Sequence, residues 1–298
     1  GTPARVFFAN SGTEANEAAF KATRMTGRKK IVAMIGSFHG RSMGSLAITY
    51  NEHYRKPFEP LPGEIIWTPY GDVAALEKVV DDTVAAVVTE PIQGENGVIE
   101  PPDDFLPAVR RITAEHGALM WIDEVQTGMG RCGEWFAHQR LDVVPDLISV
   151  AKGLGNGFPM GACIALGPAA DLFGPGEHGT TFGGNPVACA AGLAVISYIK
   201  SHDLLDHVKQ MGLRLADKVM SLDDPRIATV RGRGLLRGIV LTKPLGAEAA
   251  AAALEAGWII NSPRPSVLRI APPLIVTAEQ IDEFVDVLPS LLDAAENR

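Results

Sequence analysis

Cysteine is scarce in this chain: there are three in 298 residues, and none stands in a metal-binding spacing. Cys132, Cys163 and Cys189 have no CxxC pair or histidine cluster beside them, which is typical of reduced thiols in a cytosolic protein. We therefore expect a cytoplasmic protein without a metal site. A basic charge is also lacking, because 27 Lys and Arg stand against 35 Asp and Glu, a net charge of −8. This balance argues against nucleic acid or an anionic membrane as a partner.

Long apolar runs are missing as well. The longest, around residues 188–199, is too short to cross a bilayer. No signal peptide is visible, but the chain starts close to a strand, so we expect a preceding N-terminal segment to be absent from this sequence. A P-loop, a GxSxG elbow, an HExxH pair and a dinucleotide fingerprint are also lacking. Their absence argues against nucleotide triphosphate, serine-hydrolase, zinc-protease and NAD chemistry.

Two apolar runs of the chain end in an ionisable residue. The run 147–151 ends at Lys152, which glycines follow, and the run 119–122 ends at Asp123. An isolated amine at the end of a buried strand must be solvated, paired or covalently occupied. Two adjacent parallel strands would bring this acid and this amine to one edge of a sheet, as in a pyridoxal phosphate (PLP) site. There the lysine holds the aldehyde as a Schiff base and the acid keeps the ring nitrogen protonated. The alternative for Asp123 is a helix cap.

Strand-like and helix-like segments alternate through the first two-thirds of the chain. Strands are predicted at 6–9, 31–35, 85–89, 118–123, 147–151 and 162–166, and helices at 13–27, 72–81 and 104–116. Continuous apolar strands separated by helices predict an α/β fold, with a mostly parallel sheet covered on both faces. Ligands of such sheets bind beyond the carboxyl ends of the strands, where residues 10–13, Glu90, Asp123 and Lys152 all fall.

The last third of the chain has a different pattern. A long helical segment begins near residue 185, and the character changes after about residue 206. A hairpin-like pair (227–231 and 235–241), a helix (247–256), strands near 258–261 and 267–271 and a closing helix (277–293) follow. We expect a large cofactor-binding domain at residues 1–205 and a small C-terminal α+β domain at residues 206–298.

Two glycine-rich loops are candidates for the remainder of the site. NSGTEAN (10–16) leads into a helix N-terminus, where Gly12 would let a phosphate approach backbone N–H groups. An ordinary helix cap at Ser11 explains the same residues. GSFHGRS (36–42) offers Phe38 as a face for a pyridine ring and Arg41 as a fork for a carboxylate. A turn with a core phenylalanine is the alternative.

Three further segments carry polar groups. HGTTFGGNP (178–186) is a glycine-rich loop before a helix and is again suited to phosphate. Glu90 and Glu95 follow a predicted strand, although most acidic loop residues are simply solvated. Arg269 lies among apolar neighbours, where a lone charge usually faces outward from an alternating strand. The alternative is an anionic partner across a cleft.

Taken together and in this order, these segments resemble the class III subgroup of fold-type I PLP aminotransferases. The resemblance runs from residue 5 to residue 290 and is strongest to the branch that acts on N2-acetylornithine. Its most specific motifs are NSGTEANEAAFK, SFHGR, EPIQGE, IDEVQTGMGR, AKGLG, HGTTFGGNPVACAA, VRGRGLL and LRIAPPL. The chain departs from the usual pattern at Asn156, where the family has glycine, and at Cys132 and Ser42, where threonine is common.

The resemblance implies how the cofactor ring is held. Lys152 binds the aldehyde and later moves the proton between the substrate carbon and C4′ of the cofactor. Asp123 pairs with the pyridinium nitrogen, which makes the ring an electron sink. Gln126 hydrogen-bonds the phenolic oxygen, and Phe38 lies against the ring.

The resemblance also implies a phosphate site and a dimer. Gly12 and Thr13 bind the phosphate through backbone and side-chain groups. Thr181 is expected to reach the phosphate of the neighbouring subunit, so the active unit should be a homodimer.

The implied reaction is a ping-pong transamination of arginine biosynthesis. The amine of N2-acetylornithine passes to the cofactor and then to 2-oxoglutarate, which gives N-acetylglutamate 5-semialdehyde and glutamate. Arg269 and Arg41 could hold the two carboxylates of glutamate or 2-oxoglutarate, whereas acetylornithine presents only one, to Arg41. Glu95 is then expected to pair with Arg269. Ornithine, succinylornithine, succinyldiaminopimelate and 4-aminobutyrate stay open as substrates, and a catalytically silent PLP-fold binding protein is a further alternative.

Overall fold

The computed structural model describes residues 2–298, which divide into two compact units. The first unit contains the residues up to Pro91, Pro101–Met129 and Phe136–Tyr198, and the second contains Ile92–Glu100, Gly130–Trp135 and Ile199–Arg298. The sequence suggested a single cut between residues 205 and 206. In the structure the units alternate along the chain, because two loops from its first half pack with the C-terminal part.

A seven-stranded sheet forms the centre of the first unit, in the order β1-β7-β6-β5-β4-β2-β3. The strands are β1 (Ala4–Ala9), β2 (Lys30–Met34), β3 (Glu64–Thr68), β4 (Val84–Thr89), β5 (Leu119–Asp123), β6 (Leu147–Val150) and β7 (Gly161–Leu166). Strand β7 pairs antiparallel with both β6 and β1, and the other neighbours pair in parallel. All strands except β7 therefore point the same way, which confirms the mostly parallel sheet.

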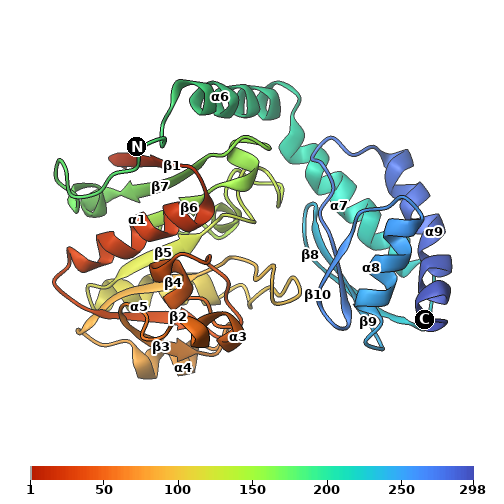
Figure 1. The fold of residues 1–298 in the computed structure, drawn as a ribbon, viewed down its shortest axis with the longest axis horizontal. Coiled ribbons are helices and arrows are strands. Elements are labelled where there is room, and N and C mark those ends of the chain that lie inside the picture. Colours follow the sequence, from red (N-terminus) through yellow and green to blue (C-terminus); the bar gives the residue numbers. More distant parts are fainter. Residues whose placement is uncertain (1) are drawn as a thin grey trace. The chain divides into compact units, whose positions relative to one another are not determined.

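Helices cover both faces of this sheet, as strand β2 shows. Val32 and Met34 belong to a core shared with α4 (Val73–Val79) and α5 (Phe105–Glu115). Ile31 and Ala33, which alternate with them, belong to the core on the opposite face, against α1 (Gly12–Arg24). In Figure 1, α1 runs across the strands of the first unit. Burial of each large apolar side chain stabilises the fold by about 1.5–3 kcal/mol. Because β2 buries side chains on both faces of the sheet, its successive residues from Ile31 to Met34 are all apolar.

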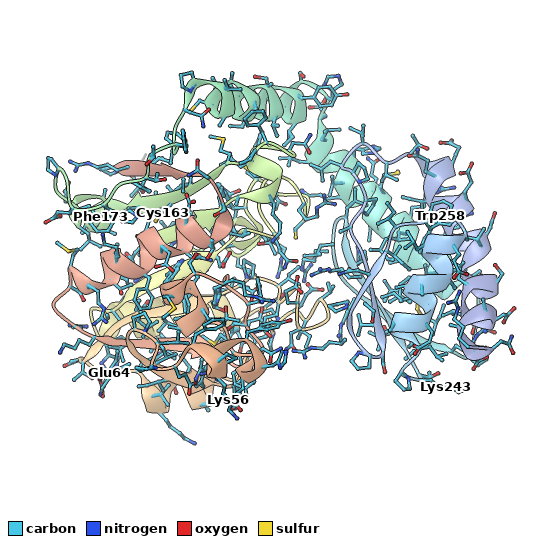
Figure 2. All side chains as sticks on the ribbon, viewed as in Figure 1. Lys56, Glu64, Cys163, Phe173, Lys243 and Trp258 are labelled. Carbon is cyan, nitrogen blue, oxygen red and sulfur yellow. The ribbon has the colours of Figure 1, made fainter. Side chains whose placement is uncertain are left out.

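The second unit is built on a four-stranded antiparallel sheet, in the order β10-β11-β9-β8. Its elements are α7 (Leu204–Met220), β8 (Ile227–Arg233), β9 (Leu236–Leu241), α8 (Gly246–Glu255), β10 (Asn261–Arg264), β11 (Val267–Ile270) and α9 (Ala278–Glu296). One apolar core joins the sheet to α7 and α9. Trp258, labelled in Figure 2, packs edge-on against Phe284 of α9 with ring centroids 5.5 Å apart.

Three elements differ from the sequence prediction. Strand β3 was not predicted, because only Thr68 of its five residues is buried and the residues show no alternation of polar and apolar types. Helix α7 was not separated from the preceding α6 (Pro186–Ser201), since the break is only two residues long and turns at the left-handed Asp203, with a φ of 49°. Strand β10 was predicted near residues 258–261 but lies at Asn261–Arg264. Trp258 and Ile260, which suggested a strand, instead contribute to the core as irregular chain.

Apolar side chains are exposed along one part of the first unit. They come from β1, the loop before α6 and α6 itself, and they are Val6, Phe8, Phe182, Val187, Leu193, Ile196 and Tyr198. Gly183 and Gly184 of this loop lie against Phe8 of β1, and exposed large apolar side chains that adjoin one another mark an interaction site.

No helix within residues 2–298 is both long and apolar enough to span a membrane.

Candidate active site

The carboxyl ends of the parallel strands bring several predicted residues to one edge of the sheet. Asp123 is the last residue of β5, and its Cα pairs with that of Ser149 in β6. Lys152 follows two residues after the end of β6. Asn10 directly follows β1, which points in the same direction. The structure therefore places Asp123, Lys152 and the 10–13 loop at the same edge, as predicted.

Asp123 is buried in a set of specific hydrogen bonds, with 4% of its surface exposed. Its Oδ2 atom accepts hydrogen bonds from Asn16 Nδ2 at 2.8 Å and from His39 Nδ1 at 2.7 Å. Its Oδ1 atom accepts one from the Val125 N–H at 2.9 Å. A carboxylate has about four lone-pair positions, so one position on Oδ1 is left for a further N–H donor. The helix-cap alternative for Asp123 is not what the structure shows.

Lys152 has an unusual backbone conformation. Its φ is +42°, in the left-handed region, and it starts the short 3-10 helix η3 (Lys152–Leu154). For a residue other than glycine this region costs about 1–2 kcal/mol. Such strain clusters at functional sites, where surrounding contacts enforce it. Lys152 is exposed and is not part of the core.

The N-terminus of α1 carries both a helix cap and a tight glycine. The Ser11 hydroxyl accepts the Glu14 N–H at 3.3 Å, and Glu14 Oε2 accepts the Asn10 N–H at 2.8 Å. This is the predicted capping arrangement, and it leaves the first N–H groups of the helix without intrahelical partners. A Cβ on Gly12 would lie 2.8 Å from Val125 Cγ1. The helix end therefore packs directly on the turn that follows Asp123.

The 36–42 loop packs on the same helix end. Thr13 Oγ1 accepts the Ser42 N–H at 3.2 Å, and a Cβ on Gly40 would collide with Thr13. Gly40 also has a φ of 137°, which other residues rarely adopt. Gly12 and Gly40 therefore allow the chain to pack closely around the start of α1.

Phe38 and Arg41 stand on this loop. Phe38 is half-buried, and its N–H donates to Glu90 Oε2 at 3.2 Å. Glu90 is itself buried, so its carboxylate positions the loop and is not simply solvated. The Arg41 guanidinium lies over the ring of Tyr54, 3.6 Å from its centroid. Tyr54 was not singled out in the sequence analysis.

Gln126 lies in the turn after Asp123. The buried acid Glu124 stabilises this turn. Glu124 Oε1 accepts the His138 N–H at 3.0 Å and His138 Nδ1 at 2.8 Å. The Thr127 hydroxyl donates to the other oxygen of Glu124. This network fixes the path of the chain around Gln126, which is half-buried.

The 178–186 loop contributes Thr180 to the 10–13 loop and leaves Thr181 exposed. Asn10 Nδ2 donates to Thr180 Oγ1 at 3.1 Å. His178 stacks on Phe173, with ring centroids 5.7 Å apart. Burial, and then the charge of Lys21, lower the pKa of His178.

Arg269 and Glu95 form an ion pair inside the second unit. Arg269 Nη1 lies 2.6 Å from Glu95 Oε1, and Arg269 Nε donates to Asn261 Oδ1 at 3.1 Å. Asn261 and Arg269 are cross-strand partners of β10 and β11. Arg269 is therefore held between an acid and an amide and does not point outward as a lone charge.

Arginines also anchor the loop that carries Glu95. Arg231 Nε donates to the Gly97 carbonyl at 2.8 Å, and Arg264 Nη2 donates to Asn96 Oδ1 at 2.6 Å. Burial lowers the pKa of Arg231. The loop is thus attached to the sheet of the second unit on both sides of the Glu95–Arg269 pair.

The residues of the first unit fit PLP. The open position on Asp123 Oδ1 suits a pyridinium N–H, and a helix N-terminus without intrahelical partners suits a phosphate. Gly12 lets the helix end pack on Val125, and Gly40 lets the 36–42 loop pack on Thr13. Within residues 2–298 no cluster of His, Cys, Asp or Glu is suited to a metal ion. A buried acid and an amine at the edge of a parallel sheet define the class of the protein, a PLP-dependent enzyme.

Comparison with known proteins agrees with this class. Residues 1–292 match the family Aminotransferase class-III. The chain is 56% identical over 295 residues to the acetylornithine aminotransferase of Mycolicibacterium smegmatis, covering 99% of this chain and 76% of that protein. It is 53% identical over 296 residues to the acetylornithine aminotransferase of Streptomyces coelicolor, covering 99% and 74%. The chain belongs to the class-III aminotransferase family.

Solved structures agree with the fold. The crystal structure of ornithine aminotransferase from Toxoplasma gondii ME49 superposes with a TM-score of 0.92 at 30% identity, covering 99% of this chain and 74% of that one. A second structure of the same enzyme, with a TM-score of 0.91 at 30% identity, covers 98% and 74% and is described with partial occupancy of PLP at its active site. The predicted fold-type I architecture and the PLP cofactor are confirmed.

Proposed function

We propose that this protein transaminates N2-acetylornithine with 2-oxoglutarate and gives N-acetylglutamate 5-semialdehyde and glutamate. The observation that carries the chemistry is the buried Asp123 carboxylate, with one acceptor position open, at the same sheet edge as Lys152. The choice of substrate rests on the acetylornithine aminotransferases that are similar along nearly the whole chain.

Different residues of the first unit are assigned to different parts of the cofactor. PLP, when bound, supplies an electron sink for the carbon next to the substrate amine. Lys152 Nζ would hold the aldehyde of the cofactor and would move the proton at the substrate carbon. Asp123 Oδ1 would accept a hydrogen bond from the ring N–H, and Gln126 would donate one to the phenolic oxygen.

Further residues orient the cofactor. Phe38 would pack against the ring, and Gly12 and Thr13 would hold the phosphate. The fixed positions of Asp123 and of the helix end support these roles, because orientation depends on groups that do not move.

The substrate carboxylates are assigned to two arginines. Arg41 binds the distal carboxylate of glutamate or the single carboxylate of acetylornithine. Arg269 binds the α-carboxylate of glutamate, and Glu95 neutralises Arg269 when acetylornithine is bound. The Glu95–Arg269 distance of 2.6 Å supports such an exchange, because it places a carboxylate directly against the guanidinium that is assigned to the carboxylate of glutamate.

A homodimer is part of the proposal. The exposed apolar side chains of β1, the loop before α6 and α6 form a surface that a second copy would cover. Thr181 lies in the same loop as Phe182 and is exposed, which suits a residue that reaches the phosphate of the partner subunit.

We also propose that residues 1–205 form the cofactor-binding domain and residues 206–298 the small domain, except that Ile92–Glu100, Gly130–Trp135 and residues 199–205 belong to the small domain. We place the protein in the cytoplasm. Three free cysteines, two of them buried, support a reducing compartment.

A panel of half-reactions tests the function. The PLP-loaded protein is mixed in separate reactions with acetylornithine, ornithine, succinylornithine and 4-aminobutyrate, and loss of the visible cofactor band is followed by stopped flow. We expect acetylornithine to react fastest and 2-oxoglutarate to restore the band. Equal reactivity with all four amines would contradict the substrate but keep the class. A band that no amine bleaches would instead indicate a silent binding protein.

A further inference from the structure

A cation–π stack in the first unit joins Arg41 to Tyr54. The guanidinium carbon of Arg41 lies 3.6 Å from the centroid of the Tyr54 ring and 5.7 Å from that of Phe38. The two rings meet edge-on, with centroids 6.3 Å apart and planes at 86°. Attraction between a guanidinium and a ring extends to about 6 Å from the centroid. The planar face of Arg41 is therefore covered by Tyr54.

The N–H groups of the same guanidinium are open. Arg41 is exposed, and it forms no hydrogen bond or ion pair with any residue from 2 to 298. Its five N–H donors form a fork that matches a carboxylate in the plane of the guanidinium. A covered face and unused donors are the features of an arginine prepared for an anionic group.

Tyr54 is held in place independently of Arg41. It belongs to the single-turn helix α3 (Glu52–Arg55), whose N-cap Asn51 accepts the His53 N–H at 3.0 Å. Arg55 in the same turn donates from Nε to the Tyr50 carbonyl at 3.2 Å and lies over the Trp67 ring of β3. Lys56, which follows α3 directly, is labelled in Figure 2 on the first unit. The Tyr54 ring thus comes from a turn that is anchored to the sheet.

We propose that Tyr54 is a positioning residue for the substrate carboxylate and acts through Arg41. A free arginine side chain loses rotamer freedom when it binds a carboxylate. Stacking on Tyr54 restricts the guanidinium beforehand and directs its N–H edge toward the ligand. The ligand class is an amino or keto acid whose carboxylate is remote from the reacting group. This inference rests on the proposed function and adds a residue to its substrate site.

The first test compares variants of the PLP-loaded full chain in the glutamate half-reaction. Tyr54→Leu should raise the KM for glutamate about two- to fivefold, the range expected for an exposed cation–π contact. It should leave kcat and the cofactor absorbance band unchanged. Tyr54→Phe keeps the ring and should restore the KM. Glu52→Gln, whose exposed side chain lies in the same helical turn and pairs with Lys56, is the control for a general disturbance of α3. An unchanged KM in Tyr54→Leu overturns the proposal.

The second test is a double-mutant cycle with Arg41→Gln. If Tyr54 acts through Arg41, adding Tyr54→Leu to Arg41→Gln should raise the KM no further. If Tyr54→Leu raises the KM for glutamate by the same factor in the wild type and in Arg41→Gln, or if it removes the cofactor band, the proposal is overturned in favour of a structural role. Glutamate is chosen because it tests Tyr54 even if the wild-type protein fails to react with acetylornithine. That failure would contradict the proposed substrate alone.

Discussion

Replacing Glu95 by glutamine should change the two half-reactions in opposite directions. Glu95 Oε1 lies 2.6 Å from Arg269 Nη1, and the two side chains are 37% and 15% exposed. A hydrogen bond to a charged group contributes about 1.5–3 kcal/mol, and partial exposure favours the low end of this range. A neutral glutamine can still accept from Arg269 but with roughly half the strength, a loss of about 0.7 kcal/mol or somewhat more.

This loss sets the size of the effect. The α-carboxylate of glutamate would displace a weaker partner from Arg269, so the KM for glutamate should fall about threefold. Acetylornithine leaves Arg269 facing no carboxylate, so its kcat/KM should fall by about the same factor because the neutralising charge is gone. The ratio of kcat/KM for glutamate to kcat/KM for acetylornithine should therefore rise about tenfold.

Stopped-flow absorbance of the PLP-loaded protein measures both half-reactions separately. Glu100→Gln is the matched control, because Glu100 lies in the same loop and is paired with Arg233 at 2.5 Å. It should not shift the ratio of the two half-reactions. If Glu95→Gln changes neither half-reaction, or changes both in the same direction, the exchange of Arg269 between Glu95 and a substrate carboxylate is wrong.

Three further changes have defined outcomes. Gly12→Ala should weaken PLP binding in an absorbance titration, because a Cβ would lie 2.8 Å from Val125 Cγ1, and Val125→Ala in the same chain should recover most of the loss. Burial raises the pKa of the Cys163 thiol from an ordinary value of 9.0 to about 12. The unfolded thiol loses its proton first, so stability should fall by roughly 1.4 kcal/mol per pH unit as the pH rises from about 9 toward 12, and urea unfolding of Cys163→Ala should lack this contribution. Asn261→Ala removes the acceptor 3.1 Å from Arg269 Nε and should raise the KM for glutamate about threefold in steady-state assays, with kcat unchanged.

The buried strands of the first unit could be predicted from the sequence because each is an unbroken apolar run. All six residues of β4 are buried, and a helix separates it from β5. Strand β3 at the edge of the sheet lacked this signal, since its residues are only partly buried. Helix α7 has a strong apolar stripe, but the boundary before it depends on the left-handed Asp203. No glycine or proline marks that position, so local composition could not reveal it.

Some of the site residues could likewise be predicted from the sequence, and others could not. Lys152 and Asp123 were predictable because an ionisable residue at the end of an apolar run has few structural explanations. The pairing of Glu95 with Arg269 was anticipated only through the family resemblance, since 174 positions separate them. Tyr54 was missed because a stack between Arg41 and a ring thirteen positions away depends on how two loops fold.

The neighbours of Asp123 show why reading motifs one at a time underestimates such a site. Asn16 is inside α1 and His39 is in the 36–42 loop, and each was read as part of a separate phosphate or ring-binding motif. In the structure both donate to the same oxygen of Asp123, and Asn16 also donates to the His39 carbonyl at 2.6 Å. The helix end, the loop and β5 are therefore locked together by one carboxylate. His39 Nε2 is buried without a hydrogen-bond partner, a cost that the bond from Nδ1 to Asp123 must offset. Three motifs that seem independent along the chain thus form one rigid support, and this support fixes the direction of the open acceptor on Asp123.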